Sequence, residues 1–192
     1  MKRALIRLAA AACLAGALGL GGACGGDEKN PNTTGGDDGE LFALTSSAFE
    51  AGEAIPQKHS CEGADVSPPL AWTDASDGTV RFALTIRDPD GGDAQHWGLI
   101  DIPGDVESLA EGISPAGDLP ADAWETLNYK GEVGYAGPCP PPPHDAHGYV
   151  FTLYALGEPI SEPDEDATLD SIEPALESAA LATTTLVGQF DR

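Results

Sequence analysis

The sequence predicts a mainly β fold, an antiparallel β-sandwich with a few short helices. Three observations lead to this class. Apolar segments of strand length recur along the chain, turns rich in proline and glycine separate them, and a convincing helical pattern occurs only near the C-terminus. Short strands divided by such turns are typical of sandwiches. At 192 residues with no internal repeat, the chain has the length of a single domain after a leader.

Six segments are predicted to be strands. The clearest is residues 81–87, where Phe82, Leu84 and Ile86 alternate with polar residues and so share one face. The others are residues 41–44, 70–72, 96–102, 149–156 and 183–190. Residues 106–129 contain many small residues and isolated prolines, so we expect long loops there, with short helical pieces, around the rim of a site.

One helix is predicted shortly before the last strand. Residues 175–181 are good helix formers, and Pro174 fits a first helical turn, where its missing N–H is not needed. Ser171 or Glu173 can cap this helix.

Residues 1–23 have the pattern of a secretory signal peptide. A positively charged start is followed by an apolar stretch over residues 8–20 and by small residues directly before Cys24. The apolar stretch is too short for a membrane-spanning helix. Small residues before a cysteine resemble a bacterial lipobox, which implies that Cys24 carries a lipid anchor. Cleavage without lipidation is the alternative.

Residues 24–40 are predicted to be a flexible linker, and residues 41–192 the folded domain. The linker is rich in glycine, aspartate, asparagine and threonine and has no apolar periodicity, so it has nothing with which to build a core.

The charge of the chain excludes some partners. The formal net charge is −23, and loss of the three positive charges of the leader leaves −26. Nucleic acid and anionic membrane surfaces would be repelled, so neither is an expected partner. We interpret the negative charge as that of a solvated surface, and it does not indicate which ligand the protein binds.

Residues 134–156 carry most of the chemical information. Pro138 and the four prolines at 140–143 have no N–H to donate, so this part is a stiff, extended loop. His147 follows it and leads into an apolar strand. Asp88, Asp90 and His96 likewise lie at predicted strand ends. The pattern favours a small binding pocket in which these four side chains meet.

These motifs together resemble the phosphatidylethanolamine-binding protein family, and more narrowly its bacterial Raf-kinase-inhibitor-like branch. They are Asp-Pro-Asp at 88–90, His-Trp at 96–97, Gly-Tyr-x-Gly-Pro-Cys-Pro-Pro at 134–141 and His-x-Tyr-x-Phe-x-Leu-Tyr-Ala-Leu at 147–156. The resemblance extends from about Leu41 to the C-terminus. It implies a Greek-key sandwich with a small anion pocket at one end.

The resemblance also implies a set of ligand-binding residues. Carried over position by position, they are Asp88, Asp90, His96, Gly137, Pro138, Pro140, Pro141, His147 and Tyr149. The chain departs from the family pattern at Gly148, where an arginine is usual, and at Pro143, Asp145 and Ala146 in the proline loop. These departures bear on the affinity and identity of the ligand.

Acids and imidazoles side by side suit a zwitterion such as ethanolamine phosphate. A protonated imidazole donates from both ring nitrogens to a phosphate. We expect nearby carboxylates to raise the imidazole pKa, which keeps that charge near neutral pH. The same carboxylates can receive an ammonium group.

Each candidate also has a structural interpretation. Asp88 and Asp90 flank Pro89 and are also typical turn formers. His96, beside a tryptophan, fits a hydrogen-bonded core histidine. His147 is the strongest ligand candidate, whereas His59 and His144 are expected at the surface.

No metal and no cofactor are expected. His144 and His147 are three residues apart, but they do not lie on a predicted helix and no cysteine pair or third histidine completes a set. Of the cysteines outside the leader, Cys24 is assigned to lipid. Cys61 and Cys139 then either pair in a disulfide or remain buried thiols.

We expect a binding protein rather than an enzyme, lipid-anchored in the bacterial cell envelope on the periplasmic side or at the outer membrane. Its partner is a phosphate-containing small molecule or a phospholipid head group. An inhibitor or partner of an envelope protease or other protein is the alternative. A hydrolase is disfavoured, because residues 112–116 fail the Gly-x-Ser-x-Gly pattern and Cys139 lies between prolines.

Overall fold

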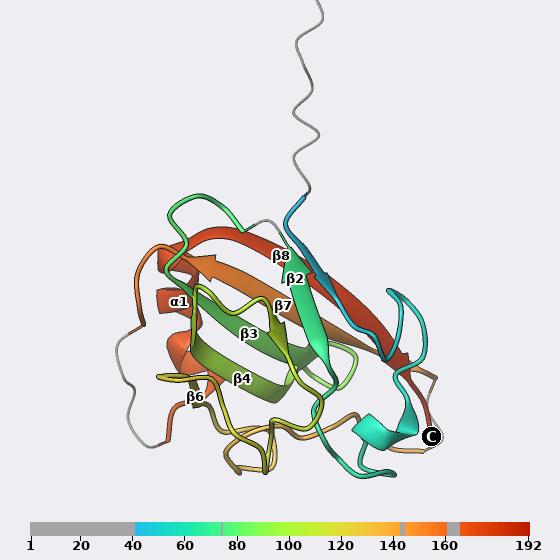
Figure 1. Ribbon diagram of the computed structural model, residues 1–192. Helices are drawn as coiled ribbons and strands as arrows, with labels where there is room; N and C mark the ends of the chain where they lie inside the picture. The colour runs from blue at the N-terminus through green and yellow to red at the C-terminus, as the bar shows by residue number, and fades with distance from the viewer. Residues whose placement is uncertain (1–40, 74, 143–144, 161–165) are drawn as a thin grey trace, which may run out of the picture. The chain divides into compact units, whose positions relative to one another are not determined.

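A computed structural model describes residues 41–73, 75–142, 145–160 and 166–192 (Figure 1). The predictions for the signal peptide, for Cys24, for the linker and for His144 lie outside the described residues. Within the described part, no helix is long and apolar enough to cross a membrane.

Two antiparallel sheets form the domain. The larger has the strand order β6-β4-β3-β7-β8 and the smaller the order β1-β2-β5. The strands of the larger sheet are β3 (Arg81–Asp88), β4 (Ala94–Pro103), β6 (Trp124–Glu125), β7 (His147–Leu156) and β8 (Ala180–Phe190). Those of the smaller sheet are β1 (Ala43–Thr45), β2 (Leu70–Thr73) and β5 (Ser108–Leu109). A 3-10 turn, η1 (Gln57–His59), and one α-helix, α1 (Leu169–Ala179), complete the described elements.

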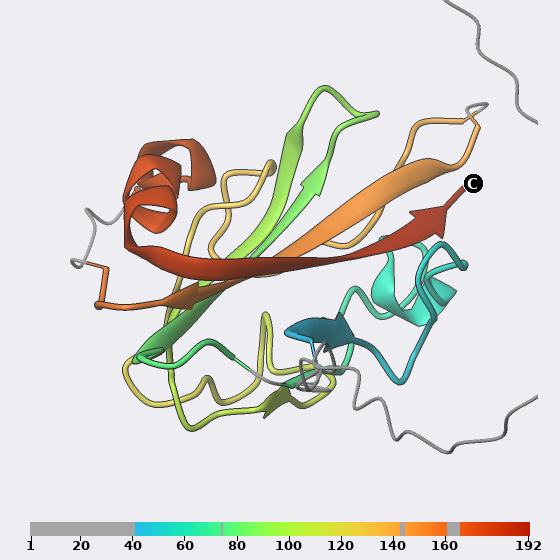
Figure 2. The same ribbon diagram turned by 90° about the horizontal axis from the view of Figure 1, so that it is seen from above.

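The larger sheet is covered on both faces, as Figure 2 shows from above. Phe82, Leu84 and Ile86 of β3 belong to the core that the sheet shares with β1, β2 and β5. Ala83 points the other way, into a second core that contains Leu176 of α1. The predicted face of apolar residues on β3 is therefore present. The opposite face, which carries the polar residues of the alternation, is buried in the middle of the strand because α1 lies over it.

The strand order is that of a Greek key. β3, β4 and β6 are neighbours in sequence order within the sheet, and β7 then returns to pair with β3 on its other side. β7 pairs along most of its length with β3 and with β8. These two antiparallel sheets with one helix confirm the predicted fold class.

The predicted start of the helix was wrong. α1 begins at Leu169, and its N-cap is Thr168, whose hydroxyl accepts a hydrogen bond from the N–H of Ser171 while the Ser171 hydroxyl accepts one from the N–H of Thr168. This reciprocal capping box satisfies two N–H groups of the first turn. Pro174 therefore lies inside the helix rather than in its first turn. The free energy gained by burying one face of the helix exceeds the cost of the backbone hydrogen bond that Pro174 cannot donate.

The predicted helical pieces between residues 106 and 129 were also wrong. The structure has two strands of two residues there, β5 and β6, which extend one sheet each. Their small size explains why no periodicity marks them, because two residues complete only one period of a strand.

Replacement of Thr168 by Ala is expected to lower the free energy of unfolding by about 1 kcal/mol, because the first turn of α1 loses its side-chain acceptor. Urea denaturation measures the change. Glu177→Ala, on the exposed side of the same helix, is the control and is expected to stay within about 0.5 kcal/mol. Equal losses in the two variants would contradict the capping role.

Candidate functional site

Three strand ends of the larger sheet meet at one small cavity. Asp88 is the last residue of β3, His96 is the third residue of β4, and His147 is the first residue of β7. β3 lies between β4 and β7, so antiparallel pairing brings the three side chains together. The cavity measures about 160 Å³ and is lined by Asp88, Gly91, Ala94, His96, Tyr129, Cys139, Pro140, Pro141 and His147.

Asp88 and His147 form a buried hydrogen-bonded pair. Nδ1 of His147 donates to Oδ2 of Asp88 over 2.8 Å, and both residues are less than a tenth exposed. Oδ1 of Asp88 accepts the N–H of Gly91 over 2.8 Å, which holds the carboxylate in the turn after β3. The carboxylate therefore fixes the orientation of the imidazole ring.

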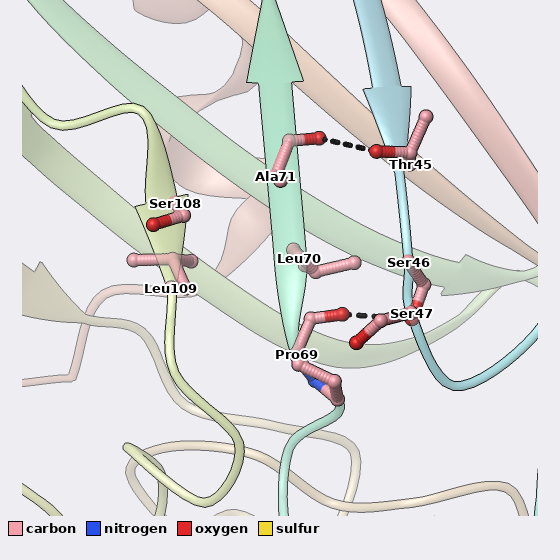
Figure 3. A pocket seen from close by; sticks show the side chains of 8 residues that line it. All are labelled: Thr45, Ser46, Ser47, Pro69, Leu70, Ala71, Ser108 and Leu109. Atoms are coloured by element: carbon pink, nitrogen blue, oxygen red, sulfur yellow. Dashed lines mark hydrogen bonds between the residues drawn. The ribbon is translucent and has the colours of Figure 1, made fainter.

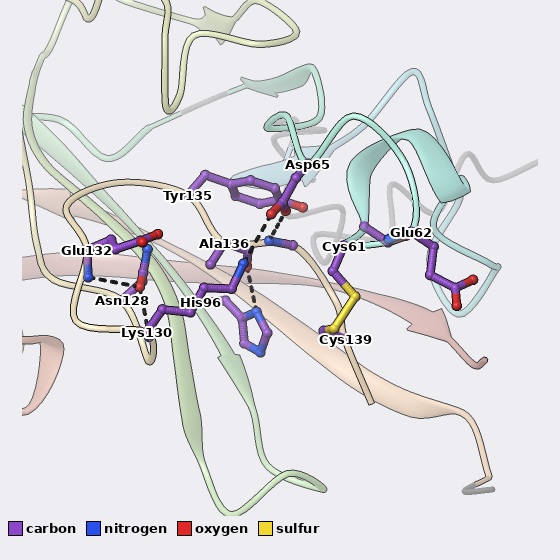
Figure 4. A network of polar contacts seen from close by, with 12 residues as sticks. Cys61, Glu62, Asp65, His96, Asn128, Lys130, Glu132, Tyr135, Ala136 and Cys139 are labelled. Carbon is purple, nitrogen blue, oxygen red and sulfur yellow. Dashed lines mark hydrogen bonds and ion pairs between the residues drawn. A yellow bond between two sulfur atoms is a disulfide. The ribbon is translucent and has the colours of Figure 1, made fainter. Parts of the chain in front are cut away.

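His96 has a different environment. Its Nδ1 donates to the carbonyl of Ala136 over 2.6 Å (Figure 4). Burial lowers the pKa of His96 below its ordinary 6.5, and neither that bond nor the charge of Asp88 compensates. For His96 the expectation of a raised pKa was wrong. The ring is neutral at pH 7, and with the proton on Nδ1 its Nε2 carries a lone pair, which accepts rather than donates.

Tyr149 lies against both imidazoles. Its ring centroid is 5.1 Å from that of His96, edge to face, and 6.5 Å from that of His147. The Tyr149 hydroxyl is buried and has no hydrogen-bond partner among the described residues. Burial, and next the negative charge of Asp88, raise the pKa of Tyr149 well above its ordinary value. The phenol is thus a neutral donor held beside the cavity.

Pro140 and Pro141 form part of the cavity wall, whereas Gly137 and Pro138 support that wall from behind. The N–H of Gly137 donates to Oδ1 of Asp65 over 2.6 Å, and the carbonyl of Pro138 accepts the N–H of Cys61 over 3.1 Å. A Cβ on Gly137 would lie 2.3 Å from the His59 carbonyl oxygen, so only glycine allows this approach.

A disulfide joins Cys61 to Cys139 (Figure 4), so the structure has the pairing rather than two buried thiols. Cys139 lines the cavity. The bond therefore fastens the proline loop to the segment that follows η1.

Asp90 acts on the site from outside the cavity. Its Oδ2 accepts the N–H of Gly148 over 2.8 Å, which ties the turn after β3 to the start of β7. A Cβ on Gly148 would point toward the side chains of Gln189 and Asp90. Position 148 therefore faces Asp90, and residue 147 beside it carries the side chain that lines the cavity.

Sequence reasoning missed Tyr129 and misplaced His59. Tyr129 lines the cavity, and its ring centroid is 4.7 Å from that of His96. In the sequence, the only indication of a role for Tyr129 was that an aromatic residue stands in a segment without apolar periodicity. His59 is buried rather than at the surface, and its Nδ1 lies 2.9 Å from the carbonyl of Val66. Gly91 and Ala94 also line the cavity and carry no signal of their own.

A larger pocket of about 380 Å³ lies on the smaller sheet (Figure 3). It is lined by Thr45, Ser46, Ser47, Pro69, Leu70, Ala71, Ser108 and Leu109. The Thr45 and Ser46 hydroxyls donate to the backbone carbonyls of Ala71 and Pro69. No charged group or imidazole lines it, so its chemistry is poorer than that of the smaller cavity.

Metal chemistry finds no support among the residues that the structure describes. No group of three or more His, Cys, Asp or Glu side chains in this part of the chain has the arrangement of a metal site.

The fold and cavity define a class: antiparallel sandwiches with a small polar pocket at the ends of their central strands. A family model for phosphatidylethanolamine-binding proteins matches residues 45–191. The chain belongs to this family.

Relatives cover nearly the whole described domain. A protein of Aquifex aeolicus named UPF0098 protein is 33% identical over 156 residues, which are 80% of this chain and 91% of that one. The "Putative lipoprotein LppC" of Mycobacterium tuberculosis (strain H37Rv) is 36% identical over 188 residues, 91% of this chain and 90% of that one.

Solved structures agree with these matches. Escherichia coli YbcL, a member of the same family, superposes with a TM-score of 0.75 at 30% identity and covers 79% of this chain and 98% of its own. The Chlamydia trachomatis homologue CT736 gives a TM-score of 0.70 at 34% identity, with 79% and 97% covered.

Replacing Cys61 and Cys139 together by Ser is expected to lower the free energy of unfolding by about 2–4 kcal/mol, because the disulfide closes a loop with a sequence separation of 78 residues. Urea denaturation of the wild type with and without reductant gives an independent measure of the same loss. The double variant itself should not respond to reductant. A wild type that is equally stable in reductant would contradict the prediction.

Proposed function

We propose that this protein binds a small phosphorylated ligand, either a soluble phosphate ester or the head group of a phospholipid, in the cavity at the ends of β3, β4 and β7. The observation that carries the proposal is the buried Asp88–His147 pair at the wall of a cavity of about 160 Å³. Pockets for drug-sized molecules measure about 300–1,000 Å³. The smaller volume suits a phosphate ester and excludes a lipid tail.

The donors beside the cavity support an anionic ligand. His147, oriented by its hydrogen bond to Asp88, places an imidazole at the wall that can donate to an anion. The buried hydroxyl of Tyr149 has no partner among the described residues, and a buried hydroxyl gains free energy from an acceptor. A phosphate oxygen supplies such an acceptor.

The hydrogen-bond acceptors beside the cavity support a ligand that also has hydrogen-bond donors. Asp88 carries a negative charge, and neutral His96 has a lone pair on Nε2. An ammonium group or a protonated phosphate can donate to them. Ethanolamine phosphate carries both kinds of group, so it matches the mixture of donors and acceptors better than a fully ionised simple anion.

The envelope location is part of the proposal. The N-terminal pattern before Cys24 resembles a lipobox, and the relative from Mycobacterium tuberculosis carries lipoprotein in its name. A disulfide between Cys61 and Cys139 suits an oxidising, extracytoplasmic compartment.

Binding rather than turnover fits the described lining residues. Asp88 and His147 have the relation of a base and its orienting carboxylate, but the described lining includes no serine or threonine, and the sulfur of Cys139 is bound in the disulfide. We therefore propose that the protein holds its ligand without a covalent step.

Titration of O-phosphorylethanolamine into the wild-type domain by calorimetry is expected to show saturable binding. His147→Gln should weaken it at least about tenfold, because the Asp88 carboxylate loses its imidazole partner and the ligand loses a donor. Ser46→Ala, in the larger pocket, is the matched control and should bind as the wild type does. Bicelles of phosphatidylethanolamine, titrated in parallel, separate the two sources of the head group.

Absence of binding to both the soluble ester and the bicelles would contradict the proposed function. In that case the alternative of a protein partner in the cell envelope takes precedence.

Binding of sulfate, whose charge is constant over the range, is expected to strengthen as the pH falls from about 7.5 to about 5.5. The free protein holds His96 neutral because its pKa is lowered, and a bound anion raises that pKa, so binding takes up a proton. The gain is at most about tenfold per pH unit for one proton. His96→Gln should reduce the change of sulfate affinity with pH. If the affinity of that variant changes with pH as steeply as that of the wild type, the proton taken up on binding belongs to another group.

A further inference from the structure

Positively charged side chains are scarce in the folded domain, and some of them lie beside the cavity. Residues 41–192 contain five Lys and Arg side chains against twenty-seven Asp and Glu. The five are Lys58, Arg81, Arg87, Lys130 and Arg192. Two of them, Lys130 and Arg192, contact residues that line the cavity. So acidic a surface repels an approaching phosphate, and positively charged side chains such as these two reduce that repulsion locally.

Lys130 lies beside Tyr129, an aromatic residue of the cavity wall. Its Nζ lies 5.6 Å from the ring centroid of Tyr129 and 3.1 Å from Oδ2 of Asp65. The turn that carries it is built around Asn128, whose side chain accepts the N–H groups of Lys130 and Glu132 (Figure 4). The position of this cation is thus set by the backbone of the turn and by one carboxylate.

Arg192 reaches the proline wall from the C-terminal end of the chain. One of its terminal nitrogens lies 3.5 Å from the carbonyl oxygen of Pro140 and 3.4 Å from the sulfur of Cys139, and both residues line the cavity. Its Nε donates to Glu62 over 3.0 Å.

One segment holds both cations. Glu62 and Asp65 follow Cys61, which is joined through the disulfide to Cys139 in the cavity wall. Figure 4 shows this segment beside the loop that carries Lys130. The two acids position the cations without using all their donors, because a lysine has three N–H groups and an arginine has five.

We propose that Lys130 and Arg192 are the fixed cations of the cavity, which draw a phosphorylated ligand to its mouth and bind its phosphate oxygens. This inference rests on the proposed function and adds to it the residues that select for negative charge. Lys130 and Arg192 both act against the rise in the pKa of Tyr129 that burial causes, which places both charges within range of the cavity wall.

The test compares Lys130→Gln and Arg192→Gln with Arg81→Gln. Arg81 is the first residue of β3 and Asp88 the last, so the control removes the same charge about 23 Å from the cavity at about 3.3 Å per residue. O-phosphorylethanolamine is titrated by calorimetry at about 20 mM and about 300 mM salt. Lys130→Arg keeps the charge and tests rescue.

At low salt, each of the two cavity variants is expected to lose about threefold to tenfold in affinity, and the double variant more. High salt should shrink the difference, since it screens exposed charges. Arg81→Gln should bind as the wild type does, and Lys130→Arg, which keeps the charge, should lose less affinity than Lys130→Gln. Thermal unfolding of each variant verifies that it is folded.

Losses no larger than that of Arg81→Gln, in folded variants of a wild type that binds, would overturn the inference and leave the proposed function intact. No binding by the wild type would overturn the proposed function and the inference together. If Lys130→Gln fails to fold, Lys130→Arg and Arg192→Gln decide: a smaller loss of affinity in the first than in the second supports the inference, and any other result contradicts it.

Discussion

The pairing of β7 with β3 is the constraint on which the site depends. β3 lies in the middle of the larger sheet, and both of its faces are covered in the middle of the strand, one by the smaller sheet and one by α1. Its register with β7 is therefore strongly specified, because a slip of one residue would turn apolar side chains to the wrong face. That register places His147 within hydrogen-bond distance of Asp88 at the end of the strand.

The cavity combines buried polar side chains with charged side chains that are exposed to solvent. The buried part, Asp88 with His147 and the neutral His96, offers matched donors and acceptors at low dielectric, where each hydrogen bond counts for more. The exposed part, in our proposal, is the pair of cations at the mouth, whose effect is longer in range and weakened by salt. The segment from Cys61 to Asp65 links the two, since it supports the proline wall and also positions the cations.

Local pattern revealed most of the fold and only part of the site. The strand over residues 81–87 and the apolar run after Tyr149 were visible because strands of this length show several periods. β5 and β6 were not visible, and the cap of α1 was misplaced because Ser171, a good capping residue by itself, serves instead as the third residue of a box with Thr168. The burial of His59 depends on the segment folding over it, which no local pattern reports.

The sequence by itself determined the fold class, the family and the set of polar residues at the strand ends, because alternation, proline runs and ordered motifs are properties of neighbouring residues. Only the tertiary structure decided which of those residues line the cavity and in what state. Asp90 and Gly137 support it from outside, Tyr129 enters its wall, and His96 is neutral there. Each of these depends on burial and on contacts between segments far apart in the chain, and such contacts leave no trace in local sequence.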